Sequence, residues 1–238
     1  MFALPPALDL TALAAAYRRD GRVVIDGLLP ADAAVALAAH LRTRGDWRKL
    51  VLSGTQVAEF DRAGWAAIPP DRAEALNLAV YAAARAGFQF RFDSIRVSDA
   101  RADRAADPTP LGAFARWMSS DAVLAMLRTI TGAADVAYAD AQATAYAPGD
   151  FLTAHDDAVA GKHRRAAYVF GLTPDWRPEW GGLLLFHRDG GRLDAIAPGF
   201  NRLTLFRVPQ EHSVSEVTRA APARRYSVTG WLRAGMQP

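Results

Sequence analysis

From Thr131 onward, the chain is divided into short segments of the kind that form β-strands. Runs of about five to ten residues rich in Val, Tyr, Phe, Leu and Thr alternate with Gly, Pro and Asp, which favour turns. This density of strands, eight in about a hundred residues, is typical of a small antiparallel barrel or jelly roll. The expected strands are 136–146, 151–157, 166–172, 182–187, 192–196, 202–208, 212–217 and 225–232.

The first half of the chain mixes helices with strands. We expect one helix capped by Asp9, a second with Pro30 at its first position, and a third after Pro69-Pro70. A longer helix at 111–130 is broken near Ser119-Ser120, where Ser120 can cap the second piece. Expected strands are 22–26, 47–52, 56–60 and 88–92, the last with the period-two pattern of one buried face. No repeat or linker is visible, so we expect a single domain over 1–238. Its helix and strand support spans 1–131 and its β core spans 132–234.

Composition excludes several classes of function. Cys is absent, so disulfides and thiolate sites are excluded, and any metal must be held by His, Asp or Glu. The formal net charge is +3 and basic residues occur only in short pairs, so we expect no direct nucleic-acid partner. No apolar run is long enough to span a bilayer, and the first ten residues lack the pattern of a secretory signal. We therefore expect no membrane partner and take the cytoplasm as the default location.

Two His-x-Asp pairs occur, and either one alone is weak evidence for a metal site. Residues i and i+2 of a strand point to one face, so His155 and Asp157 can share an ion. Asp189 instead begins an Asp-Gly-Gly hairpin signal that would carry it away from His187. His212 follows Asp157 by 55 residues, which leaves room for four strands to reach the opposite sheet. Two imidazoles and one carboxylate on one face form the ligand set of non-haem Fe(II) oxygenases.

Arg225 supplies a further candidate. It lies 13 residues after His212 on the last expected strand, and strand alternation places Ser227, Thr229 and Trp231 on its face. A buried guanidinium needs an anionic partner, which can be a carboxylate of the chain itself or a dicarboxylic cosubstrate. The sequence leaves both choices open.

The order His155-x-Asp157, His212, Arg225-x-Ser227 resembles the 2-oxoglutarate and Fe(II)-dependent dioxygenases. The segments 168–182 and 225–231 look like the prolyl-hydroxylase branch, and within it like the ribosomal-protein prolyl hydroxylases, as a single-barrel bacterial type. The likeness in motifs runs from about Tyr146 to Trp231. The eukaryotic relatives carry a second barrel that 238 residues do not accommodate, so their substrate is not assumed.

This resemblance implies a mainly β fold of the α+β kind, with a double-stranded β-helix core buttressed by N-terminal helices. It implies Fe(II) as metal, 2-oxoglutarate and O2 as cosubstrates, ascorbate as reductant, and hydroxylation of an unactivated C–H with release of succinate and CO2. The substrate would be a protein or peptide, with the translation machinery as one source. The residues implied are His155, Asp157 and His212 for the metal and catalysis; Arg225, Ser227 and Tyr146 for 2-oxoglutarate; and Trp231 and Arg164 for the substrate.

Other functions stay open or are excluded on single residues. Relatives that halogenate have a small residue where Asp157 stands, so its carboxylate favours hydroxylation. Relatives that demethylate nucleic-acid bases carry a second Arg six residues after the first, whereas this chain has Trp231 there. A cupin with another metal would show a His-x-His pair, which is missing. A hydroxylase of free amino acids or metabolites and a non-catalytic binding module remain as alternatives.

Overall fold

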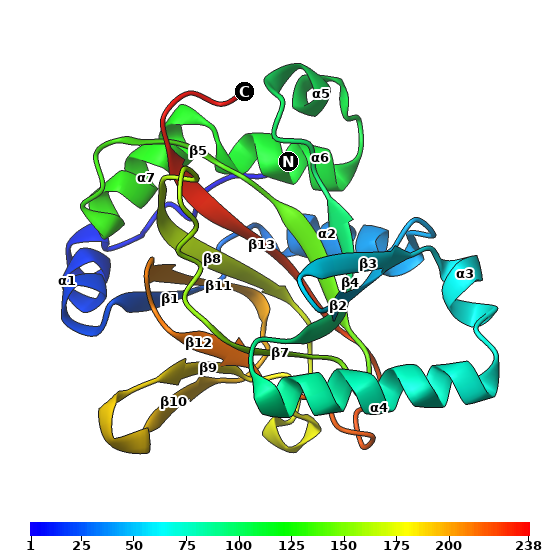
Figure 1. Ribbon diagram of the computed structural model, residues 1–238. Coiled ribbons are helices and arrows are strands. Elements are labelled where there is room, and N and C mark those ends of the chain that lie inside the picture. The colour runs from blue at the N-terminus through cyan, green and yellow to red at the C-terminus, as the bar shows by residue number, and fades with distance from the viewer.

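In the computed structural model, which describes all residues from Met1 to Pro238, 13 strands form one curled antiparallel sheet (Figure 1). The hydrogen-bonded order is β1-β11-β8-β13-β6-β4-β7-β12-β9-β10; β2 and β3 join through β4, and β5 joins β13. The predicted mainly β fold with a small antiparallel barrel is confirmed. The strands are β1 (Arg22–Asp26), β2 (Arg48–Ser53), β3 (Gln56–Phe60), β4 (Phe90–Arg96), β5 (Val136–Ala139), β6 (Gln142–Tyr146), β7 (Phe151–His155), β8 (Arg164–Leu172), β9 (Leu184–His187), β10 (Leu193–Ile196), β11 (Phe200–Arg207), β12 (His212–Val214) and β13 (Arg225–Ala234).

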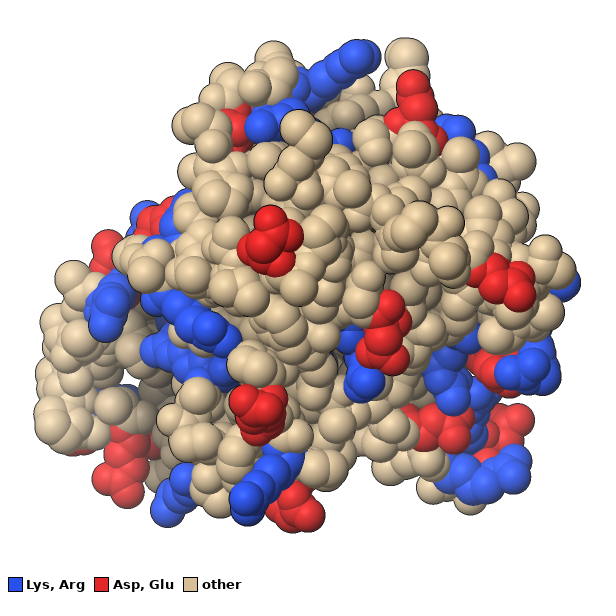
Figure 2. Space-filling view, turned by 180° about the vertical axis from the view of Figure 1, so that it is seen from behind, with Lys and Arg blue, Asp and Glu red and all other residues tan.

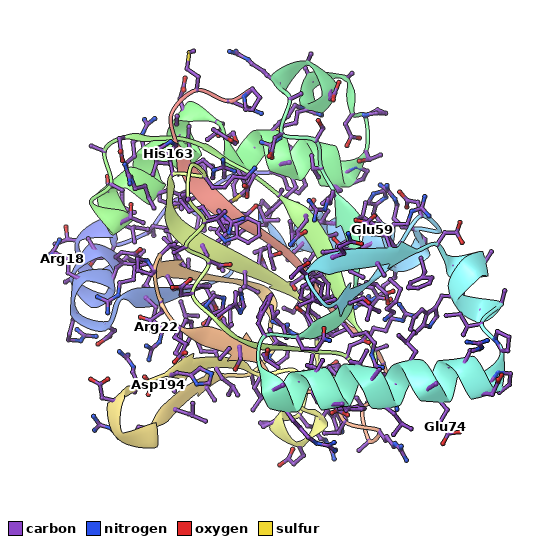
Figure 3. The ribbon with its side chains drawn as sticks, viewed as in Figure 1. Arg18, Arg22, Glu59, Glu74, His163 and Asp194 are labelled. Atoms are coloured by element: carbon purple, nitrogen blue, oxygen red, sulfur yellow. The ribbon has the colours of Figure 1, made fainter.

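An ion pair joins the two ends of this strand order. Arg22 of β1 donates to the carboxylate of Asp194 in β10 at 2.7 Å, and the two side chains come from neighbouring ribbons in Figure 3. The Arg22 guanidinium also lies over the ring of Phe186 in β9, 4.7 Å from its centroid. The sheet therefore curls back on itself, and its first and last strands meet.

Helices cover one face of the curled sheet. α1, α2, α6 and α7 pack on the outer side of β8, β11 and β13 and share the main hydrophobic core with them (Figure 1). Strand alternation divides β8 between the two sides: Tyr168 and Phe170 face the helices, and Ala167 and Val169 face the barrel interior. None of the helices has the length and apolar character needed to cross a bilayer. The helices are α1 (Leu10–Asp20), α2 (Ala31–Thr43), α3 (Arg62–Ala66), α4 (Pro70–Ala86), α5 (Arg101–Ala106), α6 (Pro110–Met118) and α7 (Asp121–Thr131).

Some local predictions are wrong. The strand predicted at 88–92 is β4, shifted toward the C-terminus. Both of its faces are buried, with Phe92 on one side and Arg91 and Asp93 in a charged network on the other. The strand predicted at 136–146 is two strands, β5 and β6, separated by Asp140 and Ala141. Pro30 is the N-cap of α2 rather than its first residue, and Ser120 precedes α7 without a side-chain capping bond. The helices α3 and α5 were not predicted, since five or six residues are too few for a periodic pattern.

Candidate metal and cosubstrate site

Two histidines meet because their strands are neighbours. β7 and β12 pair antiparallel, and the register places His212 directly opposite His155. Their ring centroids are 4.2 Å apart. The expectation that four strands separate Asp157 from His212 is confirmed by β8, β9, β10 and β11. The expectation that His212 lies on the opposite sheet is wrong, because these crossings return the chain to β12, which is hydrogen-bonded to β7 in the same sheet.

Asp157 reaches the same point by a turn and not by strand alternation. β7 ends at His155, and Asp157 lies two residues beyond it with a left-handed backbone, φ 64°. The premise that the pair shares one strand face is therefore wrong, although the two side chains do converge. The Asp157 carboxylate oxygens lie 3.4 Å from Nε2 of His155 and 3.4 Å from Nε2 of His212. One donor atom from each of the three residues falls within 4.8 Å of the others, a spacing that a single metal ion can bridge.

The backbone fixes which nitrogen each imidazole turns toward the cluster. Nδ1 of His155 lies 3.0 Å from the carbonyl of Thr153, and Nδ1 of His212 lies 2.7 Å from the carbonyl of Gln210. A carbonyl only accepts, so each Nδ1 must donate and each Nε2 keeps its lone pair for the cluster. This arrangement is the outer support that metal-binding histidines commonly have.

Burial and mutual charge set the protonation of the cluster. Burial lowers the pKa of His212 to about 4, and the nearby His155 lowers it further than Asp157 raises it. Burial acts to raise the pKa of Asp157, but the nearby His155 and His212 outweigh it and leave that pKa below its usual value. A neutral His212 beside an ionised Asp157 matches the protonation states that a divalent cation requires of these two ligands.

Arg225 begins β13 on the floor of the same cavity. The residue is 4% exposed, and its guanidinium makes no ion pair or hydrogen bond with another group of the chain. Burial lowers the pKa of its guanidinium, and its nearest aromatic neighbour is Tyr146, with the ring centroid 5.2 Å away. A buried charge without a counter-ion is costly, so this position suits an anionic ligand. The alternative of a structural Asp or Glu partner for Arg225 does not hold in this structure.

The other residues predicted for the cosubstrate lie close to Arg225 but differ in their bonding. Oγ of Ser227 shares a hydrogen bond of 2.8 Å with Oγ of Thr144, so it is already partnered. Tyr146 is 3% exposed, and burial raises the pKa of its hydroxyl above the usual value. A cavity of about 70 Å³ is lined by Tyr146, Arg225 and the three cluster residues together, as well as by Thr144 and Trp231.

Arg164 and Trp231 form the rim of the cluster next to Asp157. The Arg164 guanidinium lies flat against the Trp231 ring, 3.6 Å from its centroid, and donates to the Asp157 carbonyl at 2.9 Å. Burial lowers the pKa of Arg164, although Asp157 acts against this. Nε1 of Trp231 is buried without a hydrogen-bond partner. Both side chains therefore support the turn that carries Asp157, and their predicted contact with a substrate stays a prediction.

Sequence reasoning missed two neighbours of the site. Asp140 accepts from the backbone N–H of Trp231 at 2.5 Å and from Arg233 at 3.1 Å, which fixes Trp231 beside the cluster. Phe88, 49% exposed, places its ring 5.5 Å from the ring of His155. The alternation of Phe residues at 88–92 was a signal for Phe88, whereas nothing in the sequence marked Asp140.

The second His-x-Asp pair stays outside the cluster, as predicted. His187 ends β9, and its Nε2 lies 2.9 Å from Oγ of Ser213. Asp189 begins the short 3-10 turn, Asp189–Gly191, that joins β9 to β10.

Comparison with known proteins gives the same assignment as this geometry. Residues 141–233, which hold all three cluster residues and Arg225, match the 2OG-Fe(II) oxygenase superfamily. The matched segment runs from β6 into β13, the strands that enclose the cluster and Arg225. The oxygenase family binds Fe(II) and 2-oxoglutarate, and the residues present fit both: three converging donors for the ion and a buried, unpaired guanidinium for the distal carboxylate.

The curated relatives that match the chain are prolyl hydroxylases. Prolyl 3-hydroxylase OGFOD1 of Xenopus laevis is 31% identical over 127 residues, which are 50% of this chain and 22% of that protein. The chain thus spans about a fifth of the length of the curated relatives it matches.

Two solved structures share the double-stranded β-helix fold. One is a prolyl-4-hydroxylase of Pseudomonas putida (TM-score 0.61, 20% identity, 95% of this chain and 100% of that chain). The other is a prolyl hydroxylase from Trichoplax adhaerens in complex with a hypoxia inducible factor peptide fragment (TM-score 0.64, 16% identity, 94% of this chain and 89% of that chain). At these identities the structures support the fold alone, and they confirm the predicted core.

Proposed function

We propose that the protein is a 2-oxoglutarate- and Fe(II)-dependent oxygenase that hydroxylates a prolyl residue of a protein or peptide, with release of succinate and CO2. The observation that carries this proposal is one pocket with two chemically distinct ends. Three metal-type donors lie at one end, and a buried guanidinium without an internal partner lies at the other. A dicarboxylate that is anchored at both ends fits this arrangement.

Each residue has a defined part in the proposal. His155, Asp157 and His212 would bind Fe(II), which supplies the activation of O2 that C–H hydroxylation needs. Arg225 would hold the distal carboxylate of 2-oxoglutarate in a bidentate fork, because it is the only free cation on the pocket floor. The ring of Phe92 and the side chains of Leu152 and Leu184 line the pocket between these ends and keep water from the reacting groups.

Three protein ligands leave room at the metal for cosubstrate and O2, and the carboxylate of Asp157 favours hydroxylation over halogenation. The remaining side chains therefore bind, orient and exclude water, and the proposal requires no general acid or base from the protein. The prolyl substrate is supported by the named activity of the curated relatives. Arg164 and Trp231 stand at the rim where such a substrate would approach.

The test is an anaerobic titration with Fe(II) and 2-oxoglutarate, followed by addition of O2 and ascorbate. A weak visible charge-transfer band and succinate formation are expected, and their absence would favour a binding module without catalysis. Mass spectrometry of protein extracts, proline-containing peptides and free proline then searches for an added oxygen. Hydroxylation of free proline alone would replace the protein substrate with a small-molecule one.

A further inference from the structure

A large cavity of the molecule is separate from the oxygenase pocket. Its volume is about 590 Å³, and it lies between β2, α3 and α4 on one side and the β6–β7 turn and the start of β13 on the other. Figure 2 shows basic side chains gathered around a hollow at the left of the view. No residue of the metal cluster lines it, nor does Arg225. The volume is within the usual range for small-molecule sites.

The two cavities lie back to back, with β4 as part of the wall between them. Along β4, Arg91 and Asp93 line the large cavity, whereas Phe92 lines the oxygenase pocket. The same change of side occurs between Arg224, which lines the large cavity, and Arg225. A ligand in the large cavity would therefore not compete directly for Arg225.

The floor of the large cavity is a buried network with one positive charge in excess. Asp150 accepts from Lys49 at 2.7 Å and from Arg91 at 3.2 Å. Asp93 pairs with Lys49 at 3.2 Å and also with Arg224. Three cations thus share two carboxylates. The network holds the floor rigid and leaves it positive.

The rim adds two more unpaired guanidinium groups. Arg42 and Arg62 line the cavity and form no ion pair or side-chain hydrogen bond. Among the lining carboxylates, Asp61 pairs with Arg48, and only Glu74 has no cationic partner. The unpaired arginines of the rim and the excess positive charge of the floor together favour an anion.

Aromatic side chains complete the lining. Trp47 and Tyr226 lie side by side with ring centroids 5.9 Å apart, and Trp65 is half-buried with Nζ of Lys49 5.7 Å from its ring. Flat rings beside arginines suit a ligand that joins an aromatic ring to a negative group, because the ring can stack while the anion meets the guanidinium fork.

We propose that this cavity binds a small phosphorylated molecule with a flat ring, of the nucleoside monophosphate class. Its phosphate lies at Arg42 and Arg62, and its ring lies against Trp47 and Trp65. This site is independent of the proposed oxygenase activity, since the metal cluster and Arg225 face the other cavity.

Calorimetric titration of the full chain with AMP, inorganic phosphate and adenosine tests the proposal. AMP is expected to bind, inorganic phosphate to bind more weakly, and adenosine to show no binding. The double variant Arg42→Gln/Arg62→Gln is expected to weaken AMP binding by about tenfold or more, because it removes two charged hydrogen-bond donors. The matched control, Arg72→Gln/Arg85→Gln, loses the same charge from exposed positions of α4 outside the cavity, and it is expected to bind AMP as the wild type does.

If the two cavities are separate, Arg225→Met is expected to bind AMP as the wild type does. AMP binding therefore tests this proposal even if the oxygenase proposal fails. Circular dichroism checks that each variant is folded. Equal binding of AMP and adenosine, equal loss in both double variants, loss of AMP binding in Arg225→Met, or no AMP binding at millimolar concentration would each overturn the proposal.

Discussion

Replacing Arg225 with Met is expected to stabilise the protein while it destroys cosubstrate binding. In the chain alone, Arg225 is 4% exposed and its guanidinium has no counter-ion, so folding buries its charge at a cost. Met has a similar length and no charge. We expect the free energy of unfolding to rise by about 1–3 kcal/mol. In a domain of this size, each kcal/mol raises the melting temperature by about 2–4 °C.

The same substitution removes the anchor for the distal carboxylate. With Fe(II) under argon, 2-oxoglutarate at 100 times its Kd should stabilise the wild type by about 2.7 kcal/mol, and this gain should vanish in Arg225→Met. Thermal melts of both proteins, with and without 2-oxoglutarate, measure both effects. A variant that melts lower than the wild type, or one that still gains stability from 2-oxoglutarate, would refute the reasoning.

Arg233→Met provides the contrasting control. Arg233 is also buried, but it pairs with the buried carboxylate of Asp140 at 3.1 Å. Its removal leaves that carboxylate without a cation, so the expected loss is about 3–5 kcal/mol. The two substitutions are expected to change the unfolding free energy in opposite directions, which separates the effect of ion pairing from the effect of burial.

Further outcomes follow from the same site. His212→Ala is expected to lose bound iron and succinate formation while its circular dichroism spectrum stays that of the wild type; metal analysis and a succinate assay check this. Burial lowers the pKa of His212 to about 4 from 6.5, so between these values the unfolded chain binds a proton that the folded chain does not. The unfolding free energy of the metal-free protein should therefore fall as the pH drops from about 6.5 to 4, by at most about 3 kcal/mol, and this part of the fall should be absent in His212→Gln, as denaturant titrations at several pH values would show. Arg164→Met should weaken Fe(II) binding by about 10-fold to 100-fold, measured by competition with a chelator, because the carbonyl of Asp157 loses its donor.

Local signals in the sequence predicted most of the fold. The Asp9 side chain caps α1 as expected, Gly21 ends it with a left-handed backbone, and the turn before β10 lies where Asp-Gly-Gly stands. Pairing between distant strands could not be read in the same way. β4 is flanked by β6 and β7 of the second half, and both of its faces are buried, although its alternating residues indicated one buried face.

The candidate site shows the same division between local and distant information. The order and spacing of His155 and His212 predicted that they would meet, but not that their strands would pair side by side in one sheet. The turn at Asp157 was hidden, since a positive φ at a residue other than Gly leaves no pattern in the sequence. Whether Arg225 had a partner within the chain depended on all of its neighbours in space, so only the structure could decide it.

The insertion of β4 between β6 and β7 means that the catalytic half cannot be separated from the residues before it. The superfamily match begins at residue 141, so it leaves out β4, at residues 90–96. β4 pairs with one edge of β6 and one edge of β7, and both edges would lose their partner without it. Residues 141–233 alone would present unpaired strand edges and lose Phe92 from the pocket lining. The N-terminal half therefore supplies part of the pocket wall itself, through Phe92 of β4.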